Sequence, residues 1–167
     1  MHHSEIHSLF GNKAYIQTIG RDAFDAGRHF QATGSADVPV RIARVDDTVS
    51  IFPGHVEHDV PPTTIQLTEL VGGSHLSVYP TDESIRAEIG EPDVPIYLAQ
   101  FYQFLRTASS ARWYTCYAFD KNKILRRLSA HWFSAFGPHD AGWHIWAGMT
   151  GHPEELCNGG SVLSQPF

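Results

Sequence analysis

Residues 112–150 read RWYTCYAFDKNKILRRLSAHWFSAFGPHDAGWHIWAGMT, and this stretch decides the fold. Apolar and polar side chains alternate along it, which is typical of half-buried β-strands. Two groups of turn-forming residues, at 120–123 and 137–142, interrupt the alternation. The pattern therefore predicts an antiparallel meander of three strands, over 112–119, 124–136 and 143–150.

The meander is expected to have two unlike faces, because successive side chains on a strand point to opposite sides of the sheet. With turns of the simplest register, one face is almost wholly apolar and is expected to form the core. The other face carries aromatic rings, a thiol, two arginines and two histidines, where a solvent face usually carries Lys, Glu and Thr. The candidate binding residues on this second face are Arg112, Tyr114, Cys116, Arg127, His131, Phe133, His144 and Trp146.

The same register predicts which residues lie opposite one another on the second face. Phe133 is expected opposite Trp146, and Arg127 opposite Cys116. A polar surface rich in rings suits the binding of a small molecule or a partner protein. The alternative is that the sheet curls and the N-terminal strands cover this face as a second core layer, because aromatic residues are ordinary in sheets.

Outside the meander, the sequence predicts shorter strands and two or three helices. Alternation over 63–70 and the run 48–52 after two aspartates indicate strands, whereas residues 152–167 show no regular pattern. Three segments favour helices: 21–32, 81–89 and 93–109, the last with an apolar stripe at helical spacing. The predicted fold class is α+β, a curved antiparallel sheet with two or three helices packed on one face, in a single domain 1–167.

Composition narrows the class of partner. The net charge of −6 argues against nucleic acid and against an anionic membrane surface, both of which attract basic proteins. The N-terminus lacks the apolar region of a signal peptide, and the chain has two cysteines. Two cysteines are too few for a disulfide scaffold, so we expect reduced thiols in the cytoplasm. The expected partner is a small molecule, another protein, or a second copy of the chain in a homodimer.

Three groups of residues could carry chemistry, each with a structural alternative. The segment 55–59, His-Val-Glu-His-Asp, contains metal-ligating side chains, but in a proline-flanked loop it also fits a solvated cluster. His131 and His144 could act as a general base, with Asp140 or Glu154 as the carboxylate partner. Cys116 could be a nucleophile activated by a nearby cation, or a small buried apolar residue.

Well-defined motifs for nucleotide binding, metal-dependent hydrolysis and cysteine-based metal or redox sites do not occur in the chain. It contains no Gly-x-x-x-x-Gly-Lys-Ser/Thr loop, no Gly-x-Gly-x-x-Gly, no His-Glu-x-x-His and no Cys-x-x-Cys. The residues therefore point to no particular cofactor and assign no metal site. Two functions stay open: a binding module that uses the second face of the meander, and a small acid-base or metal-dependent enzyme centred on His131 and His144, with Arg112 or Tyr114 stabilising charge.

Overall fold

The structure is a computed structural model that describes residues 10–33, 39–52, 54–70, 85, 87, 95–134, 141–149 and 160–166. These residues form nine strands and three short helices. The strands are β1 (Phe10–Thr18), β2 (Arg21–Asp25), β3 (Ile42–Val45), β4 (Val56–Val60), β5 (Thr63–Leu70), β6 (Trp113–Phe119), β7 (Leu125–Phe133), β8 (Gly142–Met149) and β9 (Ser161–Ser164). The helices are α1 (Ala26–His29), the 3₁₀ helix η1 (Asp47–Ile51) and α3 (Leu98–Leu105).

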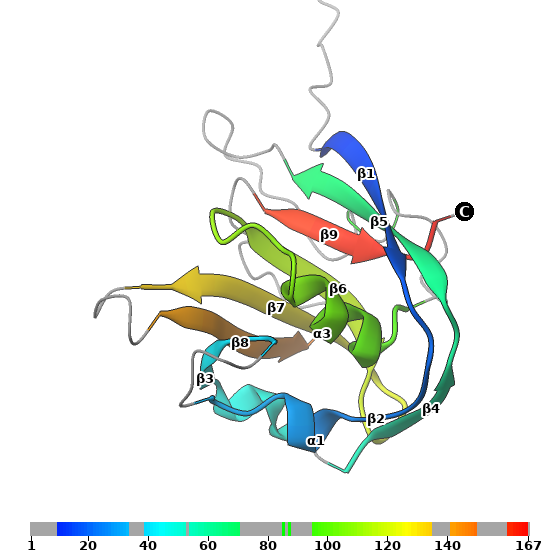
Figure 1. The fold of residues 1–167 in the computed structure, drawn as a ribbon, viewed down its shortest axis with the longest axis vertical. Helices are drawn as coiled ribbons and strands as arrows, with labels where there is room; N and C mark the ends of the chain where they lie inside the picture. Colours follow the sequence, from blue (N-terminus) through cyan, green and yellow to red (C-terminus); the bar gives the residue numbers. More distant parts are fainter. Residues whose placement is uncertain are drawn as a thin grey trace, which may run out of the picture.

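Seven strands form one mixed sheet in the order β1-β5-β9-β6-β7-β8-β3, and β2 pairs with β4 in a separate ribbon. β1 leads into β2 and β4 leads into β5, so the two segments bend together and fold beneath the main sheet (Figure 1). The bend requires glycine at position 20, where a Cβ atom would lie 2.9 Å from both Pro62 Cδ and the Val60 carbonyl oxygen. This bend connects the β1–β5 end of the main sheet to the separate β2–β4 ribbon.

Helix α3 packs between the main sheet and the β2–β4 ribbon. It buries the apolar stripe that the sequence predicts, including Leu98 and Phe101. The Phe104 ring meets Tyr114 of β6 edge to face at 4.7 Å, and Trp143 Nε1 of β8 donates a hydrogen bond to the Leu105 carbonyl at 3.2 Å. The core therefore lies around one central helix.

The predicted fold class is wrong in two respects. Strands dominate the described residues, and among them α3 is the only helix longer than four or five residues. The sheet is also mixed, since β6 pairs with β9 and β3 with β8 in parallel. Segment 21–32 forms β2 and α1, and segment 48–52 falls largely in the 3₁₀ helix, because tertiary pairing overrides such short local preferences. No helix among the described residues has the length and hydrophobicity to cross a membrane.

The three-strand meander is confirmed, but its register differs from the prediction. Phe119 pairs with Leu125, so the β6–β7 loop holds five residues, where the simplest turn has four. A slip of one residue moves every side chain of β6 to the opposite face relative to β7. The β7–β8 register differs by four residues, an even number that leaves the faces of those two strands as predicted.

The C-terminal segment contributes a central strand where the sequence predicts irregular structure. β9 lies between β5 and β6, and all four of its residues are buried. A strand covered on both sides shows no alternation of polar and apolar residues, so periodicity cannot detect it. The predicted helix 81–89 lies outside the described residues except for Ile85 and Ala87, which are both helical.

Candidate functional site

A cleft of about 550 Å³ lies beside the N-terminal end of α3. Four parts of the chain meet there: β4 with the residue before it, the segment leading into α3, the β6–β7 hairpin, and the residue after β9. Its lining residues are His55, Glu57, Pro95, Ile96, Tyr97, Phe119, Lys123 and Gln165. Its volume and mixed lining, apolar with a few polar groups, are those of a small-molecule site. We call it the α3 cleft.

Glu57 holds the inner end of the α3 cleft in place. Its carboxylate oxygens accept hydrogen bonds from the backbone N–H groups of Leu98 at 2.7 Å and Ala99 at 2.8 Å. The residue is 8% exposed, and burial raises the pKa of its carboxyl, although the two backbone bonds limit the rise. Tyr97 at the helix start offers no side-chain cap, so a residue 41 positions away supplies one.

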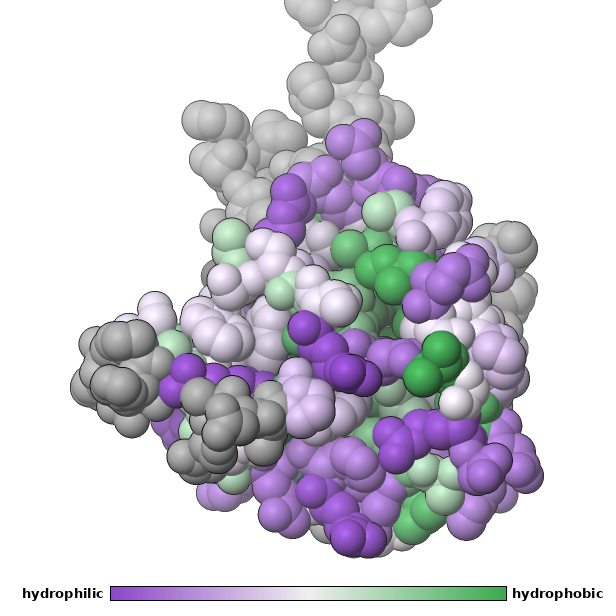
Figure 2. Space-filling view, viewed as in Figure 1, coloured by the Kyte–Doolittle hydropathy of each residue, from purple (hydrophilic) through white to green (hydrophobic). Residues whose placement is uncertain are grey.

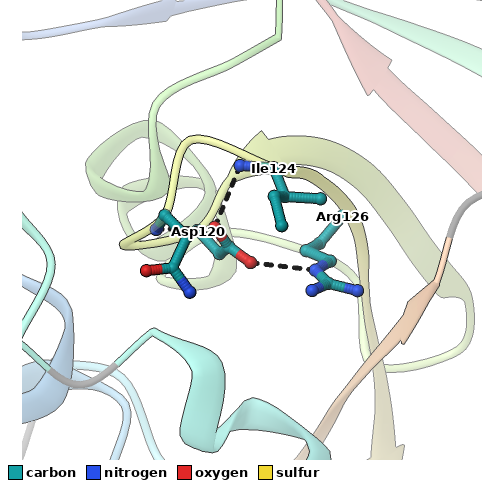
Figure 3. A network of polar contacts seen from close by, with 4 residues as sticks. Asp120, Ile124 and Arg126 are labelled. Atoms are coloured by element: carbon teal, nitrogen blue, oxygen red, sulfur yellow. Dashed lines mark hydrogen bonds and ion pairs between the residues drawn. The ribbon is translucent and has the colours of Figure 1, made fainter.

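Asp120 closes the β6–β7 hairpin, two of whose residues, Phe119 and Lys123, line the α3 cleft (Figure 3). Its Oδ1 accepts from the N–H groups of Asn122 and Ile124 at 2.8 and 3.0 Å, and its Oδ2 accepts from Arg126 Nε at 2.9 Å. Burial by itself would raise the Asp120 pKa, but these bonds outweigh burial and hold it below its usual value. The turn also places Lys123 at φ 61°, with its side chain exposed on the cleft rim.

The His55 imidazole is the titratable group of the cleft whose pKa falls. Burial lowers it, and the negative charge of Asp120 partly opposes that shift. A neutral imidazole can donate or accept one hydrogen bond to a ligand. The α3 cleft thus presents one neutral ring, one capped carboxylate and one exposed ammonium group around an apolar centre.

The segment 55–59 does not form the loop that the sequence indicates. Residues 56–60 form β4, and alternation turns Glu57 inward while His58 and Asp59 are exposed. The side chains therefore do not converge on a metal ion, and no group of three metal-ligating residues occurs anywhere among the described residues. Two of the five residues, His55 and Glu57, line the α3 cleft instead.

A second candidate site is a cluster of four rings on the other side of the main sheet, from β6, β7 and β8. Trp113 stacks on His131 with ring centroids 4.3 Å apart and planes at 17°. His144 lies 5.1 Å from His131, and Trp146 lies 5.2 to 5.5 Å from the other three rings. We call Trp113, His131, His144 and Trp146 the ring cluster.

Both histidines of the ring cluster have lowered pKa values. Burial is the main cause for each, followed by the neighbouring His144 for His131 and by Arg44 for His144. Asp46 opposes the shift at His144. Both rings are therefore held in their neutral form at neutral pH.

The structure brings three of the eight predicted binding residues together in the ring cluster, His131, His144 and Trp146. Trp113 completes the cluster, because the one-residue difference in β6 register moves it from the predicted apolar face to the face of His131. Tyr114 and Cys116 lie on the core side, and Cys116 pairs with Leu128, not Arg127. The only feature of the sequence that bears on this exchange of the two β6 faces is the length of the β6–β7 loop.

Cys116 has no property of a nucleophile in this structure. The thiol is fully buried, and burial raises its pKa well above the ordinary value, with the charge of Glu57 adding to the effect. A thiol that is not deprotonated is a poor nucleophile. The alternative interpretation, a small buried apolar residue, describes its surroundings.

The remaining three predicted residues are Arg112, Arg127 and Phe133. Arg112 forms an exposed ion pair with Glu69 at 3.1 Å, and Arg127 is 1% exposed in the sheet opposite Tyr117. Phe133 pairs with the β8 residue Gly142, not with Trp146.

Part of the predicted second face is a core layer. Tyr117, Val162, Leu70 and Ile85 form a separate buried apolar cluster on this side of the sheet. Burial there covers the middle of the sheet, and the ring cluster lies beyond it, where Trp113 is 37% exposed. Both alternatives for this face are therefore realised in part: one region is a buried core layer, and the neighbouring region is a partly exposed surface of aromatic rings.

Comparisons with protein-family models, curated proteins and solved structures return no match for this chain.

Proposed function

We propose that this protein is a binding module that holds a small, largely apolar molecule with an acidic group in the α3 cleft. The observation that carries the proposal is the cleft of about 550 Å³, whose walls come from four separate parts of the chain. The surface of the cleft is mostly apolar, which favours an apolar or aromatic body in the ligand. Figure 2 shows apolar side chains among polar ones on the face that carries α3.

The acidic group is inferred from the charges around the cleft. The Glu57 carboxylate already accepts two hydrogen bonds from the start of α3, where the helix dipole offsets negative charge. His55 is held neutral, which leaves Lys123 as the cation of the lining. An anionic end beside Lys123 and an apolar body against Ile96 and Phe119 match this distribution.

The setting that fits this proposal is the cytosol, with a small molecule as the partner. Cys116 is a free thiol, as in reducing compartments. The alternative enzyme, centred on His131 and His144, is favoured by the direct opposition of the two imidazoles. Asp140 and Glu154, the carboxylate partners that the sequence suggests for a general base, lie outside the described residues, and Asp46 is the described carboxylate whose charge acts on His144.

The test is a titration of anilinonaphthalene sulfonate, an apolar aromatic anion, followed by its fluorescence. We expect saturable binding at one site, lost in Gln165→Trp, which fills the cleft from its C-terminal wall. Lys123→Asn should weaken binding of the anion but not of a neutral naphthalene analogue, because asparagine tolerates the positive φ while the charge is removed.

A matched control is Tyr15→Ala, an exposed aromatic residue of β1 that does not line the cleft. Equal probe affinity in the wild type, Gln165→Trp and Tyr15→Ala would refute the proposal. Native mass spectrometry of the untagged protein adds a direct readout, since a bound small molecule retained through purification appears as extra mass.

A further inference from the structure

His131 and His144 lie directly opposite each other on β7 and β8, with both side chains on the same side of the sheet. Residues in such a cross-strand pair have their Cβ atoms about 5 Å apart. Their imidazole centroids are 5.1 Å apart, and the ring planes meet at 70°. Pairing of the two strands therefore places the two rings next to each other.

One nitrogen of each ring is buried without a hydrogen-bond partner. These atoms are His131 Nδ1 and His144 Nε2, and neither has a donor or acceptor among the described residues. A buried polar atom without a partner costs about 1–3 kcal/mol. Two neighbouring rings that each keep such an atom are suited to a group that would satisfy both.

The separation of the rings fits a shared metal ion. A Zn²⁺–nitrogen bond is about 2.0–2.1 Å long, and zinc prefers tetrahedral angles. Two imidazoles on one such ion have their ring centres about 5 Å apart, by the same bond lengths and angles. The observed 5.1 Å agrees with this value. Neutral imidazole is also the form that binds metals, and burial favours it for both residues.

We propose that His131 Nδ1 and His144 Nε2 together bind one Zn²⁺ ion. No third protein ligand occurs nearby in the described part of the chain, so water would take the two remaining positions. Two-coordinate attachment by protein makes this an exchangeable site, unlike a closed four-ligand structural site. It is independent of the α3 cleft, since none of its residues lines that cleft.

Charges of both signs act on the pair, and the positive one has the larger effect on His144. Arg44 of β3 pairs with His144 in the register, and its positive charge opposes a bound cation. Asp46 acts on the same ring with the opposite sign. Entry requires Trp113 to move aside, and this ring covers His131 while remaining 37% exposed.

The experiment is a calorimetric titration of the full chain with Zn²⁺ at neutral pH. We expect one ion per chain, with the corresponding heat lost in His131→Gln and in His144→Gln. His2, His3 and His58 could bind zinc weakly outside the pair, so His58→Gln and a His2→Gln, His3→Gln double variant serve as matched controls that keep the signal. Unchanged heat in both pair variants would overturn the proposal.

A second measurement uses the wild-type protein and so does not depend on the variants folding. Zn²⁺ should shift the ¹⁵N resonances of His131 Nδ1 and His144 Nε2 in a long-range proton–nitrogen spectrum, because the metal binds those atoms. Fluorescence of Trp113 and Trp146 should change at the same zinc ratio. Shifts confined to the exposed histidines would show adventitious binding and reject the site.

Discussion

The two histidine-bearing regions of this protein make an instructive comparison. The segment His55–Glu57 and the pair His131–His144 both contain residues suited to chemistry, yet they are held by different forces. Glu57 is fixed by hydrogen bonds to a helix 41 residues away, whereas the ring cluster is fixed by strand register and ring stacking. The α3 cleft therefore depends on hydrogen bonds between β4 and α3, and the ring cluster depends on the length of the β6–β7 loop, which sets the face on which Trp113 lies.

The largest expected effect on stability is that of Glu57→Ala, which removes the hydrogen bonds between β4 and α3. The change removes both acceptors from the buried N–H groups of Leu98 and Ala99 and leaves them unpaired. Loss of a helix cap together with two charge-assisted bonds should lower the free energy of unfolding by about 3 kcal/mol. Urea denaturation at neutral pH measures the change.

Two variants sharpen that measurement. Glu57→Gln keeps one acceptor oxygen and should lie between the wild type and Glu57→Ala. Glu69→Ala removes a partly exposed ion-pair partner of Arg112 and should cost less than about 1 kcal/mol. Equal losses in Glu57→Ala and Glu69→Ala would mean that the cap contributes no more than a surface charge.

The next largest effect concerns the loop that sets the register of the ring cluster. Asp120 is fully buried and accepts three hydrogen bonds, so Asp120→Ala should lower the free energy of unfolding by about 2 kcal/mol. Its pKa is lower in the folded protein than in the unfolded chain, so its contribution is present above about pH 4 and is lost as the pH falls further.

The difference between wild type and Asp120→Ala should accordingly shrink as the pH drops from 6 to 3, which denaturation at several pH values would show. Lys121→Ala is the control, since this exposed residue of the same loop accepts none of those bonds. A difference that is constant with pH would indicate that the carboxylate charge is not what closes the loop.

The same loop explains how far sequence reasoning reaches in this molecule. Alternation alone located β5, β6, β7 and β8, and the apolar spacing located α3, because those signals are local. The face of β6 depends on whether the loop after Phe119 holds four or five residues, a choice made by the Asp120 carboxylate and by Lys123 in the left-handed region. Composition does not encode that choice.

The α3 cleft could not be predicted from the sequence. Its walls include Gln165, next to a buried strand without alternation, and Glu57, whose partner helix lies far along the chain. The histidine and aspartate next to Glu57 indicate metal binding when only the local sequence is considered. In β4, however, Glu57 points inward while those two side chains are exposed, so they do not converge on an ion. Contacts between distant parts of the chain therefore form the cleft. The histidine pair could be predicted because β7 and β8 are consecutive strands.

The smallest effect compares two aromatic residues of nearly equal exposure, Trp113 at 37% in the ring cluster and Phe119 at 39% on the cleft rim. Trp113 stacks on His131 and meets Trp146 edge to face, and such contacts contribute about 1 kcal/mol beyond burial. Trp113→Ala should therefore lower the free energy of unfolding by about 1 kcal/mol more than Phe119→Ala. Phe119→Ala should instead weaken the naphthalene probe, which Trp113→Ala leaves unchanged. Urea denaturation and the probe titration, run on both variants, separate the two regions, and an effect of both variants on both readouts would show that they act as one.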